Sequence, residues 1–306
     1  MAKKRGRARL HLLFLPAVRA VGGEKISKIV MHNISDKNGK GRRATHTAYM
    51  RFRHFVKSGY WRGHHIHSPF VYHMVRDVIT TRTPNDREIR ERAEEYRRAL
   101  YADDRRIMVR QMGAVNREPR LRKICDIAKR TSTTEKYGRL LARIARELEI
   151  DSILELGTSM GISTAYLALS RPGARVVTIE GVAEVAEVAE ARLKEAGINN
   201  VTVLRGDIDE KIDEAIAMLP RGEVGLAFID GNHSKDATLR NFEKISAHRA
   251  ALSVLIFDDI YWSDGMTTAW NTIVADSRVS TTIELAQMGL AIFRSGCQKE
   301  HYNLRW

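Results

Sequence analysis

The chain has 306 residues, 43% of them hydrophobic, which is enough for one large domain or two small ones around an apolar core. Its two cysteines, Cys125 and Cys297, lie far apart and form no C-x-x-C pair. This argues against a disulfide framework or a thiolate metal site and favours a reducing, cytoplasmic location. No apolar run approaches the roughly 20 residues of a membrane-spanning helix.

The positive charge of the chain is concentrated at its start. Residues 1–60 hold 15 Lys and Arg against Glu24 and Asp36, a net charge of +13, whereas residues 61–306 hold 36 bases and 35 acids. We therefore predict that residues 1–50 are a basic, disordered extension. Three interpretations of it stay open: a tether to nucleic acid or another anionic surface, a targeting peptide around LHLLFLPAV, or a solvated tail. We favour the solvated tail, and Met31 and Met50 are alternative starts.

Residues 51–132 have a helical pattern with little strand signal. Ser68 before Pro69 predicts an N-cap followed by proline in the first helical turn. The interleaved charges of 84–112 predict a long solvated helix, and 121–129 predicts another. Ser132 and Glu135 match a capping box for a helix over 136–148.

Strands and helices alternate from residue 152 onward. Apolar runs at 153–156, 175–179, 201–204, 225–229 and 254–257 predict strands, and helical patterns occupy 162–169, 183–196, 210–218 and 235–247. After a helix at 265–275, residues 278–294 read as two alternating runs joined by a short turn, which predicts an antiparallel hairpin. We predict an α/β fold for 133–306: a doubly wound, mostly parallel seven-stranded sheet with a terminal antiparallel hairpin, preceded by the helical segment 51–132.

A glycine turn follows the first of these strands, in ILELGTSMGIST (153–164). Gly157 would let the backbone approach a ligand, and Gly161 would let the next helix pack closely on the strand. The middle glycine that cradles a dinucleotide pyrophosphate is missing, which favours a cofactor without phosphate, S-adenosylmethionine (SAM). Glu155 would lie near the amino and sulfonium groups of SAM.

Two later strands end in residues that complete such a site. Glu180, 23 residues after Gly157, stands where a ribose-binding carboxylate belongs, and Asp207 would border the adenine. The predicted cofactor-binding residues are Glu155, Gly157, Thr158, Ser159, Gly161, Ser163, Glu180, Gly181, Gly206, Asp207, Ile208 and Asp230.

With these motifs, residues 133–294 resemble the class I SAM-dependent methyltransferases, and in particular the small O-methyltransferases of the catechol and caffeoyl-CoA type. The segments HSPFVY, KYGRLL, FIDGNH, FDDIYWSDGM and QKEHYNLRW are similar to a bacterial group of class I methyltransferases. This wider similarity covers nearly everything after Met50. It implies an enzyme that transfers a methyl group from SAM to a small-molecule acceptor, most often to oxygen.

The resemblance also implies a reaction centre. In the metal-dependent members, an Asp and an Asp-Asn pair hold Mg²⁺, and the matching positions here are Asp230 and Asp258-Asp259. Asp259 departs from the family's Asn, and His233 stands where the family has a catalytic Lys. We predict that Asp230 and His233 are catalytic, with His233 as the general base, and that Mg²⁺ or another divalent cation binds the aspartates. Alternatively, His233 caps the next helix and the aspartates bind only cofactor or a loop.

Other aromatic and imidazole side chains are weaker candidates. His64, His65 and His67 suggest a metal site, although such a cluster before a helix is more often a surface or partner contact. Trp262 is a candidate for lining the acceptor pocket, which we expect residues 51–132 to close. Whether the protein forms a homo-oligomer stays open.

Two other functions compete with methyl transfer to a small molecule. A nucleic-acid methyltransferase or binding protein could use the basic arm, but the body is nearly neutral and no N-P-P-Y-like motif follows the fourth strand. An NAD-dependent enzyme is disfavoured by the glycine pattern and the terminal hairpin.

Overall fold

The computed structural model describes residues 39–59, 66–81, 85–109 and 118–306. The chain divides into two units, residues 1–46 and 47–306. Helix α2 (Gly39–Lys57) contains the boundary that the sequence suggested at residue 50, and its Met50 is buried. The predicted extension therefore does not reach residue 50, and the rest of it, 1–38, lies outside the described residues, as do His64 and His65.

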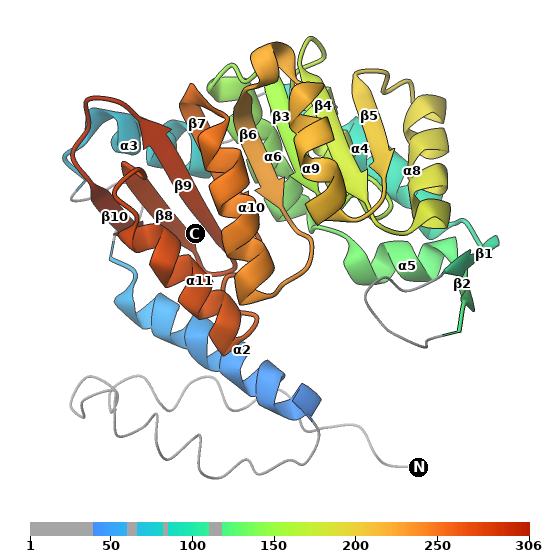
Figure 1. Ribbon diagram of the computed structural model, residues 1–306, viewed down its shortest axis with the longest axis horizontal. Coiled ribbons are helices and arrows are strands. Elements are labelled where there is room, and N and C mark those ends of the chain that lie inside the picture. Colours follow the sequence, from blue (N-terminus) through green and yellow to red (C-terminus); the bar gives the residue numbers. More distant parts are fainter. Residues whose placement is uncertain (1–38, 60–65, 82–84, 110–117) are drawn as a thin grey trace. The chain divides into compact units, whose positions relative to one another are not determined.

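An eight-stranded sheet forms the centre of the second unit (Figure 1). Its strands are β3 (Ser152–Leu156), β4 (Arg175–Glu180), β5 (Val201–Arg205), β6 (Val224–Ile229), β7 (Arg249–Phe257), β8 (Thr281–Leu285), β9 (Met288–Arg294) and β10 (Glu300–Asn303). Their order is β10-β8-β9-β7-β6-β3-β4-β5. The β3–β7 strands are parallel, and β9 pairs antiparallel with both β7 and β8.

The doubly wound fold and the terminal hairpin are therefore confirmed, with one correction to the strand count. The sheet has eight strands and not seven, because β10 pairs in parallel with the edge strand β8. Its sequence, EHYN, has only Tyr302 as an apolar residue, which gave no alternating pattern to recognise.

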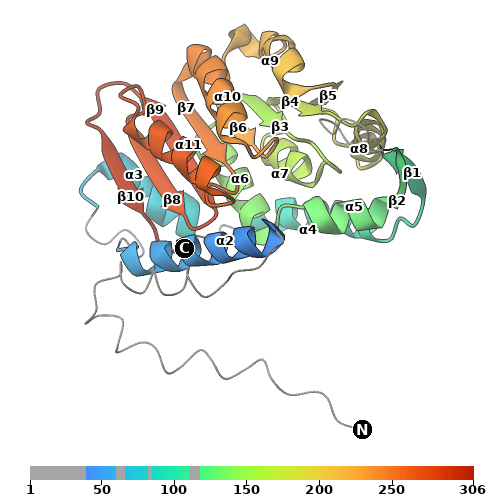
Figure 2. The same ribbon diagram turned by 60° about the horizontal axis from the view of Figure 1, so that its bottom comes forward.

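Side chains of the central strands alternate between two apolar cores. In β6, Leu226 and Phe228 pack on one face of the sheet, whereas Ala227 and Ile229 pack on the other. The first core includes residues of α4 (Asn85–Tyr101), α6 (Glu135–Glu147), α7 (Ile162–Ser170) and α8 (Ala183–Glu195). The second includes residues of α9 (Ile208–Ala217), α10 (Lys235–Ala247) and α11 (Asp264–Ala275). Figures 1 and 2 show these helix layers on opposite faces of the sheet.

The chain reverses its direction across the sheet between β3 and β6. From β3 it proceeds outward through β4 to the edge strand β5, then returns to the other side of β3 to form β6 and β7. Such a switch point opens a crevice at the carboxyl ends of the strands, where ligands of doubly wound proteins bind. The candidate site lies there.

The segment before the sheet differs from the predicted run of helices. Helix α3 (Pro69–His73) has Ser68 as its N-cap residue but no side-chain capping bond, and it continues as a π-helix, η3 (Met74–Thr80). After α4, strands β1 (Arg106–Val109) and β2 (Arg120–Lys123) form an antiparallel pair that the sequence did not suggest. Helix α5 (Ile124–Thr131) follows, and a 3₁₀ turn (Pro220–Gly222) precedes β6.

The predicted capping box at the start of α6 is wrong. The N-cap residue is Thr134, and its side chain makes no capping bond. Ser132 instead ends α5, and its hydroxyl donates a hydrogen bond to the main-chain carbonyl of Ala128. Residues 132–134 of this hydroxyl-rich run therefore form the linker between α5 and α6.

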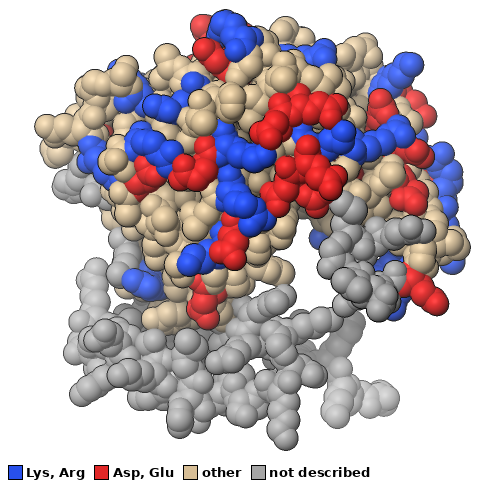
Figure 3. Space-filling view, viewed as in Figure 1, with Lys and Arg blue, Asp and Glu red and all other residues tan. Residues whose placement is uncertain are grey.

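The surface of the second unit mixes both signs of charge. Figure 3 shows Lys and Arg interleaved with Asp and Glu over the face that carries α9 and α10. Arg240 and Lys244 of α10 pair with Asp209 and Asp213 of α9, each at 2.7 Å. Within the described residues, no helix is both long and apolar enough to cross a membrane.

Candidate active site

The turn after β3 requires glycine at its first position. Gly157 has φ +102°, and a Cβ there would lie 2.7 Å from the main-chain oxygen of Asp230 at the end of β6. Its N–H and that of Thr158 both donate to the carbonyl of Ile179 in β4. Gly157 therefore admits a close approach of two main chains at the edge of the crevice, whereas the sequence suggested the approach of a ligand.

Gly161, the N-cap residue of α7, serves a different contact from the predicted one. It has φ +75°, and a Cβ there would lie 2.9 Å from the hydroxyl of Tyr96 in α4. That hydroxyl donates a 2.8 Å hydrogen bond to the carbonyl of Met160. The glycine admits a tyrosine from the preceding helical segment, where the sequence suggested packing of helix against strand.

Glu155 is fully buried beneath the turn. One carboxylate oxygen, Oε2, accepts hydrogen bonds from the hydroxyls of Thr164 and Thr178, and Oε1 has no hydrogen-bond partner among the described residues. Burial raises the pKa of Glu155 from 4.5 to about 7, although the hydroxyl donors oppose the shift. Its carboxylate therefore links α7 to β4 and does not line the main cavity of the crevice.

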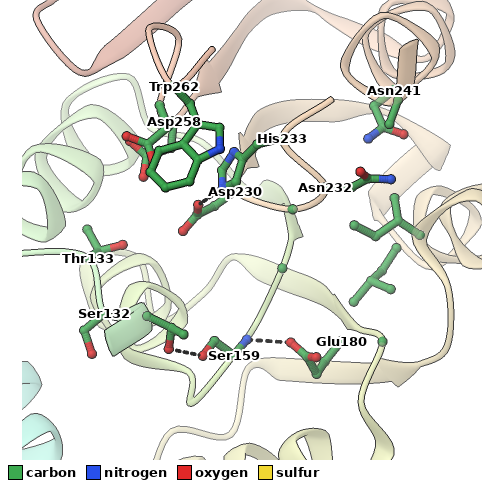
Figure 4. Close-up of a pocket in the computed structure, with 18 of the residues that line it drawn as sticks. Ser132, Thr133, Ser159, Glu180, Asp230, Asn232, His233, Asn241, Asp258 and Trp262 are labelled. Atoms are coloured by element: carbon green, nitrogen blue, oxygen red, sulfur yellow. Dashed lines mark hydrogen bonds and ion pairs between the residues drawn. The ribbon is translucent and has the colours of Figure 1, made fainter. Parts of the chain in front are cut away.

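A cavity of about 810 Å³ opens at the carboxyl ends of the strands (Figure 4). Its volume is in the usual range for sites that hold small molecules. Ten predicted site residues line it: Gly157, Ser159, Glu180, Gly181, Asp207, Ile208, Asp230, His233, Asp258 and Asp259. Thr158 and Ser163 line a small adjoining pocket, whereas Glu155, Gly161 and Gly206 line neither.

Several lining residues escaped the sequence analysis. These are polar or aromatic side chains from the α5–α6 linker, α6, α10 and the β8–β9 turn: Ser132, Thr133, Tyr137, Asn241 and Gln287. The sequence marked only Ser132 and Thr133, through the hydroxyl-rich Thr131–Thr134 run. That run was ambiguous, because a linker between two helices is also rich in hydroxyl residues.

Glu180 ties two strands together at the cavity wall. Its Oε2 accepts a 2.8 Å hydrogen bond from the N–H of Ser159, and its Oε1 accepts a 2.9 Å bond from the N–H of Val182. Each carboxylate oxygen has a second lone pair, so the side chain can accept further hydrogen bonds from a ligand.

Three carboxyl groups face the other half of the cavity. Asp230 follows β6, and Asp258 and Asp259 follow β7. Burial, reinforced by repulsion from Asp259, raises the pKa of Asp258 to about 7. Burial and the charges of Asp258 and Asp259 raise the pKa of Asp230 well above its ordinary value.

These aspartates do not form a set of metal ligands. Among the described residues, no three His, Cys, Asp or Glu side chains are grouped so that they could hold a metal ion. Asp258 instead accepts a 3.1 Å hydrogen bond from the amide of Gln287, and Asp259 lies 3.8 Å from the guanidinium of Arg51. The donor set predicted for Mg²⁺ is therefore not arranged to hold a divalent cation, and of the histidines considered as a metal site His64 and His65 lie outside the described residues.

His233 lies in the loop after β6 and lines the cavity with Trp262. Its Nε2 is 3.6 Å from Asp230 Oδ1, and the rings of His233 and Trp262 have centroids 6.1 Å apart. Burial lowers the pKa of His233 below 6.5 despite the opposing charge of Asp259. His233 does not cap α10, because Ser234 accepts the capping bond from the N–H of Ala237.

Unusual backbone angles coincide with the cavity wall. Ser159, Asn232 and Asp259 have φ between 47° and 50°, in the left-handed region that non-glycine residues seldom adopt. They follow β3, β6 and β7 respectively, and all three line the cavity. Strained turns at the ends of three strands are typical of a site whose side chains are held in position.

Comparison with known proteins agrees with this geometry. Residues 154–260 match a family model described as a methyltransferase domain. This match confirms the resemblance to methyltransferases over residues 154–260.

Individual relatives share parts of the chain. A catechol O-methyltransferase of Mycobacterium tuberculosis is 30% identical over 139 residues, 45% of this chain and 60% of that protein. A protein-L-isoaspartate O-methyltransferase of Ignicoccus hospitalis is 52% identical over 58 residues, 19% of this chain and 28% of that protein. The chain thus spans less than two thirds of the length of these curated relatives. The crystal structure of an O-methyltransferase from Bacillus cereus in complex with SAH covers 74% of this chain and 97% of its own, with 20% identity and a TM-score of 0.47.

Proposed function

We propose that this protein transfers a methyl group from SAM to a hydroxyl oxygen of a small molecule. One observation carries the proposal: a single cavity joins the turn after β3 and the end of β4 to His233 and Trp262. The turn after β3 and the end of β4 would hold the cofactor, and His233 and Trp262 would contact the acceptor. Methyl transfer needs both partners in one enclosure, with the nucleophile in line behind the methyl group.

The cofactor half of the cavity suits SAM. Gly157 brings the turn after β3 close to the main chain of Asp230 at the cavity wall, and Glu180 would accept hydrogen bonds from the ribose hydroxyls. Asp207, the N-cap residue of α9, lines the wall beyond β5, where the adenine would lie. When bound, SAM supplies a methyl group activated by its positively charged sulfur.

The acceptor half offers a base. The lowered pKa of His233 keeps its imidazole neutral at pH 7, so that Nε2 or Nδ1 can accept a proton from the attacking hydroxyl. The charge of Asp259, which opposes the lowering of the pKa of His233, would then stabilise the imidazolium. Trp262 would exclude water from one side of the acceptor.

A hydroxyl acceptor agrees with the site better than a carboxylate, the other acceptor suggested by the names of the relatives. A carboxylate is already ionised at neutral pH and needs no base, which would leave His233 without a role. It would also bring a further carboxylate beside Asp230, Asp258 and Asp259, which already repel one another. Phenols and other weakly acidic alcohols enter the cavity uncharged, and the base can then remove their proton.

Other partners receive less support. The mixed charges over α9 and α10 do not form the basic surface that nucleic acid requires, and the basic residues of 1–38 lie outside the described residues. Cys125 and Cys297 are both free, in keeping with our proposal of a reducing compartment.

Calorimetric titration with S-adenosylhomocysteine, the demethylated product of SAM, tests the proposal. Wild-type protein should bind it, and Gly157→Arg should abolish binding, because a side chain there would collide with the main chain of Asp230 and displace the turn that lines the cavity. Gly173→Arg is the matched control, because nothing lies within 4 Å of a Cβ at that glycine. Binding of NAD in place of S-adenosylhomocysteine would refute the proposal.

A further inference from the structure

Helix α2 approaches the acidic side of the cavity. The hydroxyl of Thr47 donates a 3.2 Å hydrogen bond to the carbonyl of Tyr261, and Nε2 of His54 lies 3.0 Å from the carbonyl of Leu304. Met50, between them, is buried in the core that contains α10 and α11. These contacts fix the helix on both sides of Arg51.

Arg51 and Gln287 together engage both adjacent aspartates. The Arg51 guanidinium donates a 3.3 Å hydrogen bond to Oε1 of Gln287 and lies 3.8 Å from Oδ1 of Asp259. The amide nitrogen of Gln287 donates a 3.1 Å hydrogen bond to Oδ1 of Asp258. The carbonyl of Gln287 also accepts a 3.1 Å bond from the N–H of Ile260, which fixes the β8–β9 turn beside these carboxylates.

We propose that Arg51 takes the place of a divalent cation at the Asp258–Asp259 pair, so that the site works without a metal ion and α2 is part of it. The inference rests on the proposed function. Its physical basis is that three clustered carboxyl groups repel one another unless a positive charge lies among them. Arg51 supplies that charge from the chain itself, and the Gln287 amide carries the contact on to Asp258.

This arrangement changes the expected acceptor. A bound metal would select molecules with two adjacent oxygens that could both coordinate it. Without one, His233 needs only a single hydroxyl within reach, so a simple phenol or alcohol would serve as well as a catechol. Arg51 is then a positioning residue: it holds the aspartates and does not touch the reacting atoms.

Binding of Mn²⁺, followed by electron paramagnetic resonance, tests the inference directly. Wild-type protein should bind no Mn²⁺ at millimolar concentration. Arg51→Met should gain affinity by about tenfold or more, because the aspartates lose their neutralising charge. Arg51→Lys, which keeps the charge, should remain like wild type. Arg53→Met is the control, since Arg53 lies on the same helix but lines a different cavity.

The outcomes separate this inference from the proposed function. Tight Mn²⁺ binding by wild type that disappears in Asp258→Ala would overturn it, as would an unchanged Mn²⁺ affinity in folded Arg51→Met. Binding of S-adenosylhomocysteine in the presence of chelator, measured on the same samples, reports on the proposed function alone. The Mn²⁺ titration decides the role of Arg51 whether or not that ligand binds.

Discussion

Glu180, the last residue of β4, accepts a hydrogen bond of 2.8 Å from the main-chain N–H of Ser159 in the turn after β3. The bond fixes a turn whose Ser159 has φ 47°, an angle that would otherwise be strained. One carboxylate thus shapes the cavity wall and, with its free lone pairs, faces the ligand space. The same side chain would bind the ribose and position the turn.

Replacing Glu180 with alanine should therefore weaken cofactor binding. A hydrogen bond to a charged group contributes about 1.5–3 kcal/mol, so the dissociation constant of S-adenosylhomocysteine should rise by between about 10- and 100-fold. Isothermal titration calorimetry would measure it. Glu187→Ala, at an exposed position nearby, should leave the constant unchanged, and an equal loss in both variants would contradict the assignment.

How far the sequence predicted this site depends on where each signal lies. Gly157, Glu180 and Asp230 follow alternating or apolar strands, and the carboxyl ends of parallel strands meet at one edge of the sheet, so their convergence was predictable. Arg51 was not, because more than 200 residues separate it from Asp259 and Gln287. Nothing local in α2 marks one of its several arginines as the one that approaches Asp259.

The partners of the three aspartates could not be predicted for a related reason. Sequence placed Asp230, Asp258 and Asp259 at one edge but could not show which neighbours would engage their oxygens. Gln287 lies in the turn of the terminal hairpin, and the sequence predicted only that this turn connects two strands. The β1–β2 pair was missed similarly: RIMV and RLRK are too short and too charged to stand out from the helical pattern around them.

Buried Glu155 should make stability depend on pH. Burial raises its pKa from 4.5 to about 7, so between these pH values the folded state keeps a proton that the unfolded state has lost. The free energy of unfolding should therefore fall as pH rises through this window, by about 3 kcal/mol in total. Glu155→Gln should lose most of that fall, as followed by urea denaturation from pH 4 to about 8. Exposed Glu149→Gln is the control, and parallel pH profiles for Glu155→Gln and wild type would refute the prediction.

The packing of α2 on the body can be tested with two residues of that helix. Met50 is 7% exposed within the second core, whereas Phe52 is 52% exposed. Met50→Ala should lower the free energy of unfolding by about 2–5 kcal/mol, and Phe52→Ala by about 0.5 kcal/mol or less. Denaturant unfolding would measure both. Similar small losses would mean that α2 contributes little to the core.

His233 should control the acid side of the pH–rate profile once an acceptor is found. A general base must be neutral, and burial lowers the pKa of His233 below 6.5, so the rate should stay constant near pH 7 and fall only as pH drops below that lowered value. His233→Ala should reduce turnover by between about 100- and 10,000-fold and remove this acid limb, with little change in S-adenosylhomocysteine affinity. Added imidazole should restore part of the rate, which it would not do for a residue that only supports the fold. His248→Ala, an exposed histidine at the end of α10, is the control and should behave like wild type. Full turnover in His233→Ala with the acid limb retained would contradict the assignment of His233 as the base.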